Sequence, residues 1–119
     1  MLLFISVMLV GCNNTSNETN KNLKSIEISI YDKAEKLIYD EKIETEKKTL
    51  LEALKSIEEL KIETEDSEYG AFITSIKRIK QEDDYYWNYY VNGEYATAGI
   101  SSYNVKENDK FKFVLEKFE

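Results

Sequence analysis

The sequence predicts an α+β fold of the β-grasp type, in which a mixed sheet packs on one helix. Three observations predict it. Apolar and polar residues alternate along several short segments, as they do in half-buried strands. One segment instead has the spacing of a helix, and it falls between a hairpin and a further group of strands. At 119 residues the chain is long enough for one domain with its own core.

The first predicted strands form a hairpin. In "LKSIEISIY", Ile26, Ile28 and Ile30 share one face, and polar residues occupy the other. The segment "DKAEK" predicts the turn, and residues 37–43 predict the second strand.

After this hairpin the hydrophobic period changes to that of a helix. The segment "KKTLLEALKSIEEL", residues 47–60, predicts it, with Thr45 or Thr49 as the N-cap. Its apolar residues recur at Leu50, Leu51, Leu54, Ile57 and Leu60.

Strands resume in the second half of the chain. They are predicted over residues 72–80, 84–91, 94–98 and 110–118. Asn92-Gly93 predicts a type I′ hairpin turn, because both residues tolerate positive φ.

Alternation within these strands predicts which side chains face the helix. The residues expected in the core are Trp87, Val91, Phe111, Phe113, Ile28 and Leu54. Those expected on the opposite, exposed face are Tyr86, Asn88 and Tyr90.

The N-terminal segment predicts the cellular location. Residues 1–11 are largely apolar and precede Cys12, after which residues 13–22 are polar. The apolar run is too short for a permanent transmembrane helix, which needs about 20 residues, and it suits the apolar part of a signal peptide.

The end of that run, "LVGC", resembles the bacterial lipobox. The resemblance implies a signal peptide over residues 1–11, lipidation of Cys12 with palmitate among its acyl chains, and a flexible tether over residues 12–22. The folded domain is then expected over residues 23–119, outside the cytoplasm and anchored to the bacterial cell membrane.

Composition argues against two classes of function. Charged residues make up 33% of the chain with a net charge of −7 and no cluster of Lys and Arg, so nucleic acid is not expected as a partner. The chain has no histidine, and Cys12 is its single cysteine, so we expect no enzyme activity. The acidic run at residues 82–84 is typical of a solvated turn, and no metal site is predicted.

The segments "YWNYYVNG", "AGISSY" and "NVKENDKFKF" resemble a bacterial family of unassigned function related to the C-terminal β domain of transcobalamin and intrinsic factor. The resemblance covers roughly residues 26–118. Asn108 stands where the family has glycine, a change that the left-handed conformation tolerates. The matching positions are Trp87, Asn92-Gly93, Gly99, Tyr103 and Asp109.

This resemblance implies a β-grasp domain with an edge that faces a ligand. In the vitamin carriers the domain covers one face of a corrinoid while a separate helical barrel holds the other, and this sequence contains no such barrel. The resemblance therefore makes a corrinoid the leading candidate ligand, which the protein is expected to capture or to deliver to a membrane transporter. No required cofactor is expected.

The predicted ligand surface combines exposed tyrosines with the small-residue loop "EYATAGISSY", which a flat ligand can approach closely. The predicted ligand-binding residues are Tyr86, Asn88, Tyr90, Tyr95, Gly99, Ile100 and Tyr103.

Two alternatives stay open at this point. Exposed tyrosines also stabilise sheets without binding anything. The domain is alternatively a non-enzymatic interaction module of the cell envelope, docking another protein through a sheet edge or its aromatic face. A concave aromatic surface favours a ligand, and a flat open edge favours a protein.

Overall fold

The computed structural model describes residues 23–117. The signal peptide, the lipidated Cys12 and the tether predicted above lie outside this range. Within it, no helix has the length and apolar character needed to cross a bilayer.

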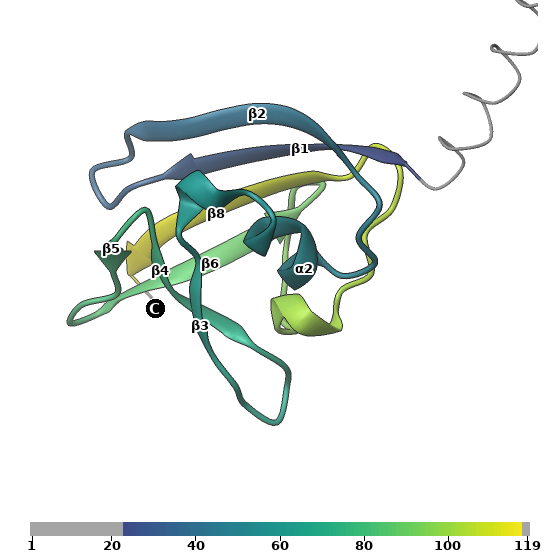
Figure 1. The fold of residues 1–119 in the computed structure, drawn as a ribbon. Coiled ribbons are helices and arrows are strands. Elements are labelled where there is room, and N and C mark those ends of the chain that lie inside the picture. The colour runs from purple at the N-terminus through teal and green to yellow at the C-terminus, as the bar shows by residue number, and fades with distance from the viewer. Residues whose placement is uncertain (1–22, 118–119) are drawn as a thin grey trace, which may run out of the picture.

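A five-stranded sheet forms the centre of the domain (Figure 1). Its spatial order is β2 (Leu37–Thr45), β1 (Lys24–Tyr31), β8 (Lys110–Lys117), β6 (Tyr85–Val91) and β7 (Glu94–Tyr95). The first and last of its strands along the chain, β1 and β8, pair in parallel, and all other neighbours are antiparallel. The mixed sheet predicted from the sequence is therefore present.

The remaining elements cover one face of this sheet (Figure 1). They are α2 (Leu50–Lys55), the 3₁₀ helices η1 (Glu58–Leu60) and η2 (Ile100–Ser102), and a small sheet of β3 (Glu63–Glu65), β4 (Phe72–Ile76) and β5 (Ile79–Lys80). Strands thus dominate the described chain, with one short α-helix. The finer β-grasp assignment stays a prediction.

The helix begins as predicted but ends early. Thr49 caps it through a reciprocal capping box with Glu52, which satisfies two free N–H groups of the first turn. The helix has six residues, because Ser56 Oγ donates to the carbonyl of Ala53 (2.6 Å) and Ile57 turns extended. This exit lets Leu60 enter the core, where it is fully buried.

The strands differ from the prediction in three places. The segment 72–80 is broken by a turn at Lys77 and Arg78, both at positive φ (51° and 69°), so it forms β4 and β5. Strand β7 ends at Tyr95, well before residue 98, and β3 was not predicted at all. Neither lysine nor arginine is a typical residue for positive φ, so the sequence carries no signal for the break.

The assignment of faces is largely confirmed. The side chains of β1, β8 and β6 that alternate inward are buried with α2 in one core: Ile26, Ile28, Ile30, Leu54, Trp87, Tyr89, Phe111, Phe113 and Leu115. Val91, expected in the core, is only half-buried because β7 beside it is short. The turn at Asn92-Gly93 has positive φ at both residues (52° and 89°), and Asn108 is left-handed (φ 71°), as predicted.

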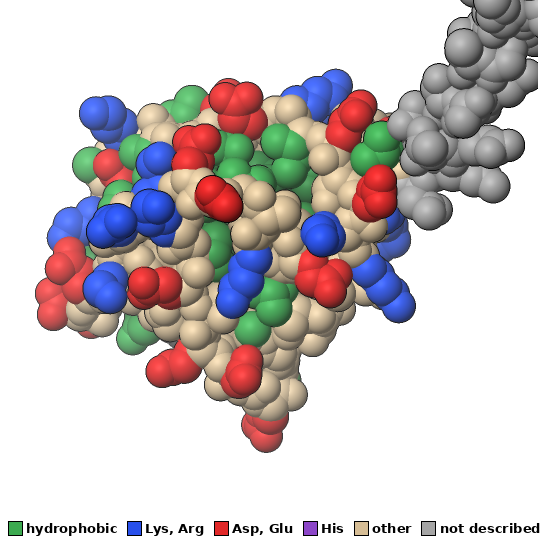
Figure 2. All heavy atoms as spheres, in the orientation of Figure 1, with side chains coloured by type: hydrophobic (Ala, Val, Ile, Leu, Met, Phe, Trp, Pro, Cys, Tyr) green, Lys and Arg blue, Asp and Glu red, His purple; other side chains and the backbone are tan. Residues whose placement is uncertain are grey.

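Charges are interspersed over the face that carries α2. Figure 2 shows acidic and basic side chains side by side there, with no patch of one sign.

Candidate functional site

The opposite face of the five-stranded sheet is named the outer face here, because neither α2 nor the small sheet lies over it (Figure 1). The strand register fixes which side chains meet on it. Ser29 pairs with Asp40 and Lys112, and Tyr90 pairs with Lys112 and Tyr95, so these five residues form one row across all five strands.

Tyr90 lies on the outer face beside the edge strand β7 and is fixed by its neighbours. Its hydroxyl donates to Glu116 Oε2 (2.6 Å), which also accepts from Asn88 Nδ2 (3.2 Å). The Tyr95 ring meets the Tyr90 ring edge to face, with centroids 5.6 Å apart. Lys112 Nζ lies 4.9 Å from the centre of the Tyr90 ring. The tyrosine is therefore held in one orientation before any ligand arrives.

An aromatic hollow lies where β6 has no long neighbour. Its volume is about 350 Å³, and it adjoins the single tryptophan. Trp87 is fixed there by two hydrogen bonds, from its backbone N–H to Gln81 Oε1 and from Nε1 to the carbonyl of Ile79, both 2.9 Å. The hollow is lined by Phe72, Gln81, Tyr86, Trp87, Asn88 and Tyr95.

Most of the large hydrophobic residues that are exposed in the described part of the chain line this hollow. Phe72, Tyr86 and Tyr95 are 37%, 44% and 48% exposed, and they are three of the five large hydrophobic residues exposed within residues 23–117. The other two, Leu37 and Tyr69, lie elsewhere in the chain. Their meeting at one place makes this hollow the candidate binding surface.

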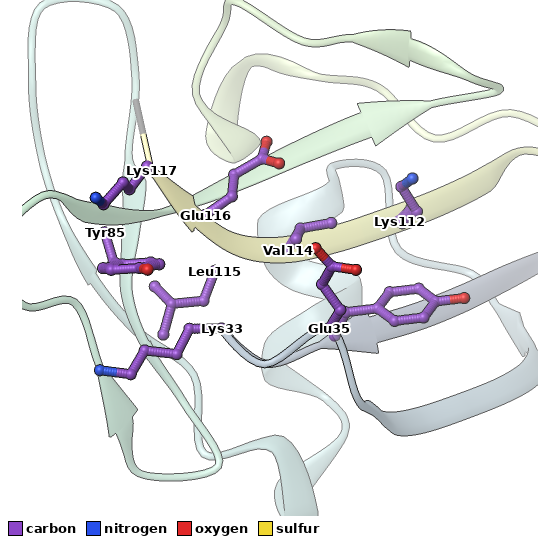
Figure 3. A pocket seen from close by; sticks show the side chains of 9 residues that line it. Lys33, Glu35, Tyr85, Lys112, Val114, Leu115, Glu116 and Lys117 are labelled. Atoms are coloured by element: carbon purple, nitrogen blue, oxygen red, sulfur yellow. The ribbon is translucent and has the colours of Figure 1, made fainter. Parts of the chain in front are cut away.

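A second hollow, of about 560 Å³, opens beside Glu116 at the end of β8 (Figure 3). Lys112, Val114 and Glu116 project into it from one side of β8, and the turn between β1 and β2 closes it with Lys33 and Glu35. Lys112 and Glu116 thus line this hollow and also contact Tyr90.

Tyr103, predicted to bind a ligand, belongs to a different cluster. Its hydroxyl donates to Asp109 Oδ2 (2.7 Å), which also accepts from the backbone N–H of Lys106 (2.9 Å). Asn92 Nδ2 donates to Asp109 Oδ1 (3.0 Å), and Asn92 Oδ1 accepts from the N–H of Lys110 (2.9 Å). We call this group of hydrogen bonds the Asp109 clasp; it ties the β6–β7 turn to the start of β8.

Tyr103 also borders a third hollow of about 520 Å³ beneath the β6–β7 hairpin, together with Tyr95 and residues 96–98. Tyr95 is the one predicted residue that lines both this hollow and the aromatic hollow. The predicted ligand-binding residues therefore do not all lie on one side of the sheet.

Gly99 and Ile100 lie inside the domain, with Ile100 only 1% exposed. A Cβ built on Gly99 would lie 2.5 Å from the carbonyl oxygen of Ala71. The N–H of Gly99 donates to Tyr69 O (2.9 Å), and the N–H of Ile100 donates to Ala71 O (2.8 Å). Gly99 and Ile100 therefore serve contact between two chain segments, which corrects the expectation that these two residues expose backbone to a ligand.

Sequence reasoning missed Phe72, Gln81, Lys112 and Glu116. Phe72 and Gln81 reach the hollow from the small sheet and the segment that follows it, whose position relative to β6 the sequence does not encode locally. The alternation of β8 does place Lys112 and Glu116 on the outer face, and the pairing of β8 with β6 was the missing step.

The acidic run at residues 82–84 lies exposed in the turn before β6, as predicted. Among residues 23–117, no three His, Cys, Asp or Glu side chains come together as metal ligands.

Three tyrosines make stability depend on alkaline pH. The hydrogen bond to Glu116, aided by burial, raises the pKa of Tyr90 to about 12. Burial raises the pKa of Tyr89 to about 12. Burial, followed by the hydrogen bond to Asp109, does the same to the pKa of Tyr103.

We expect the free energy of unfolding to fall as the pH rises from about 10 to about 12. Unfolded tyrosines lose their protons near pH 10, whereas these three keep theirs to about pH 12 in the folded chain. The folded chain then binds more protons, so their stabilisation is complete below about pH 10 and is lost as the pH approaches 12. Urea midpoints across this range measure the effect. Tyr90→Phe should flatten the decline, with the exposed Tyr69→Phe as control, and parallel declines in parent and Tyr90→Phe would refute the assignment.

A small β-rich domain with one open sheet face is the class of protein that these observations define. Residues 47–117 match the family described as a domain of unknown function, DUF4430, and the chain belongs to that family. A search of the curated proteins found no match.

Two solved structures resemble the chain. The first, from Ruminococcus gnavus ATCC 29149 and described as a "putative metal binding protein", is 26% identical with a TM-score of 0.72, and the match covers 81% of this chain and 99% of that one. The second, haptocorrin in complex with Cbi, is 20% identical with a TM-score of 0.67, and the match covers 82% of this chain and 26% of haptocorrin. Haptocorrin belongs to the transcobalamin family, so the transcobalamin-like resemblance is confirmed at the level of the fold. The chain spans about a quarter of haptocorrin's length.

Proposed function

We propose that this domain binds a flat, partly apolar small molecule in the aromatic hollow at the edge of β6 and over the adjoining outer face, and that a corrinoid is the leading candidate. The observation that carries the proposal is the convergence of Phe72, Tyr86 and Tyr95, all exposed, on one hollow beside Trp87. Exposed aromatic rings with fixed neighbours are the usual means of holding a flat ligand.

The geometry of the site fits a ligand that has one apolar part and one polar part. Its apolar part lies against the aromatic hollow, where Phe72, Tyr86 and Tyr95 are exposed. Its polar part lies over Tyr90, where Lys112 supplies donors and Glu116 supplies acceptors. Because Tyr90 is already held by these neighbours, binding costs little ordering of its side chain.

The fold supports a corrinoid in particular, because the similar region of haptocorrin belongs to a protein solved in complex with Cbi, which is cobinamide. This chain corresponds to only about a quarter of haptocorrin. We therefore expect modest affinity, with a dissociation constant of about 1 μM, equivalent to about −8 kcal/mol.

The role we propose is binding without catalysis, at the outer surface of a bacterial membrane, with transfer of the ligand to a transporter. Its anchor is the acylated Cys12, which the lipobox-like sequence supports. Cells fed labelled palmitate should label the parent protein and not Cys12→Ala. A Cys12→Ala protein that still fractionates with membranes would contradict the anchor.

Trp87 fluorescence tests ligand binding, because corrinoids absorb where tryptophan emits and Trp87 borders the hollow. We expect cobinamide to quench the full-length protein saturably. Removing two stacking rings in Tyr86→Ala/Tyr95→Ala should weaken binding about tenfold, since each aromatic contact contributes about 0.5–1.5 kcal/mol. Both residues are exposed, so the fold should persist.

Tyr69→Ala is the matched control, because Tyr69 is 65% exposed on the β3–β4 loop and lines none of the three hollows described above. It should bind like the parent. Linear quenching of equal slope in parent and double variant, with cobinamide, cobalamin and haem alike, would mean light absorption without binding and would end the proposal.

The metal binding attributed to the Ruminococcus gnavus protein is not part of this proposal. Within residues 23–117, no three His, Cys, Asp or Glu side chains lie close enough together to bind a metal ion.

A protein-docking module is the second candidate, and the outer edge of β2 favours it. This nine-residue strand has a sheet neighbour on one side only. Its exposed Asp40, Glu41, Lys42 and Glu44 are, however, the kind of residues that protect edge strands from pairing. We therefore place the docking module second.

A further inference from the structure

We propose that the aromatic hollow prefers a ligand group that is uncharged and both accepts and donates hydrogen bonds, a carboxamide, and that Gln81 is the residue that sets this preference. The inference rests on the function proposed above in one respect, because it takes the ligand to lie in this hollow. It adds the chemical class of the group that the ligand presents there and the side chain that recognises it.

One edge of β6 lacks a strand neighbour at the hollow. All seven residues of β6 pair with β8 on one side, whereas β7 pairs only with Tyr90 and Val91 on the other. On this open edge the backbone N–H of Trp87 donates to Gln81 Oε1 (2.9 Å). A backbone N–H in the interior of a strand needs an acceptor, so the glutamine side chain takes the place of a neighbouring strand.

This hydrogen bond fixes which end of the Gln81 side chain meets a ligand. The carbonyl oxygen faces the Trp87 N–H, because only that end of the amide accepts a hydrogen bond. The NH₂ end is therefore left to donate to a group in the hollow. The Gln81 backbone is also held, since its N–H donates to the carbonyl of Thr74 (3.0 Å). Donors that are fixed before binding cost little further ordering.

Asn88 supplies the complementary acceptor. Its Nδ2 donates to Glu116 Oε2 (3.2 Å), so its carbonyl oxygen Oδ1 is the end left for a ligand. The hollow thus offers donors at Gln81 and an acceptor at Asn88, both among the residues that line it. A carboxamide has an acceptor and two donors and matches both side chains, whereas a carboxylate has acceptors alone.

The charges around the hollow also favour an uncharged group. Charged residues make up 33% of the chain, yet none of the six residues that line the hollow is charged. The Glu116 carboxylate contacts one of them, Asn88, and would repel an anionic group on the ligand. A cationic group has no acceptor for the donors of Gln81. A neutral carboxamide avoids both costs.

Three probes of similar shape test this preference: benzamide, benzoate and benzamidinium, which share a ring and differ in the charge and hydrogen-bonding groups of its substituent. The readout is the set of backbone and side-chain amide signals of the full-length protein. We expect saturable benzamide shifts at Trp87 and Gln81. The two charged probes should bind about tenfold more weakly, because each leaves a polar group of the hollow without a partner.

Gln81→Glu should weaken this preference. The variant keeps an oxygen for the Trp87 N–H, so the fold should persist. Its carboxylate has no donor, so benzamide should bind about fivefold more weakly, the effect of one lost hydrogen bond. Asn104→Asp makes the same change of amide to acid at an exposed residue that lines none of the three hollows described above, and it should bind benzamide like the parent.

The inference would be overturned by the absence of saturable benzamide shifts, by equal binding of benzamide and benzoate to the parent, or by an unchanged benzamide affinity in Gln81→Glu. A second arm compares cobinamide with cobyrinic acid, which has carboxylates where cobinamide has amides. The parent should prefer cobinamide, and Gln81→Glu should bind it more weakly. Benzamide preference without corrinoid binding would remove the proposed corrinoid function and leave the inference standing. Corrinoid binding that Gln81→Glu leaves unchanged would do the reverse.

Discussion

Replacing Asp109 by alanine should cost about 3 kcal/mol of folding free energy, among the largest effects of any polar substitution in this domain. Asp109 is only 4% exposed, and its carboxylate accepts from Tyr103, Asn92 and the backbone of Lys106. Without it, three donors lose a charged acceptor, and the hydroxyl of Tyr103 has no substitute in its half-buried position. Urea unfolding of the full-length protein, followed by Trp87 fluorescence, measures the loss.

Two further variants test whether the loss of stability comes from the hydrogen bonds of the Asp109 clasp or would follow any substitution of an aspartate. Tyr103→Phe removes one hydrogen bond and should cost about 1 kcal/mol, and in the Asp109→Ala background it should cost much less. Asp84→Ala, an exposed aspartate in the turn before β6, should stay within about 0.5 kcal/mol of the parent. If Asp109→Ala and Asp84→Ala were equally stable, the clasp would have no energetic role.

The clasp gives a structural reason for several positions of the family resemblance. Asn92, Tyr103 and Asp109 occur together in the motif because they bond to one another. The clasp brings the turn after β6 to the start of β8, and β6 and β8 then pair along seven residues. Correct pairing of these strands is what places Tyr90 beside Lys112 on the outer face.

Local patterns predicted the strands and their faces well. Alternation in β1, β6 and β8 placed Ile28, Trp87 and Phe113 in the core, because a buried face needs an apolar residue at every second position. The turn at Asn92-Gly93 was predicted because few other residue pairs adopt its φ values. Each of these features is encoded within fewer than ten residues.

The site was predicted only in part, because its other half depends on tertiary contacts. Tyr86, Asn88 and Tyr90 followed from alternation within β6. Phe72 joins them from the small sheet and Gln81 from the segment after it. Tyr103 lies apart from them because its loop is on the other side of the sheet. No periodicity in the sequence reports such crossings.

Gly99 is where the sequence-based interpretation and the structure differ most, and Gly99→Ala distinguishes them. If the loop were small in order to admit a ligand, one methyl group would cost affinity and leave the fold intact. In the structure the added Cβ would lie 2.5 Å from Ala71 O, 2.6 Å from Gly70 C and 2.7 Å from Ala71 N, all backbone atoms. Backbone held by hydrogen bonds on both sides cannot yield cheaply, so the domain should lose about 3 kcal/mol with no ligand present.

Gly93→Ala is the control for this last variant, because the two glycines differ in the kind of constraint. Gly93 has positive φ (89°) but open space within 4 Å of an added Cβ, so alanine there meets backbone strain alone, about 1–2 kcal/mol. Gly99 has ordinary φ (−68°) and no free space. Gly99→Ala should therefore unfold at lower urea than Gly93→Ala, and the reverse order would mean that the loop yields and that contact with residues 69–71 is not what requires glycine.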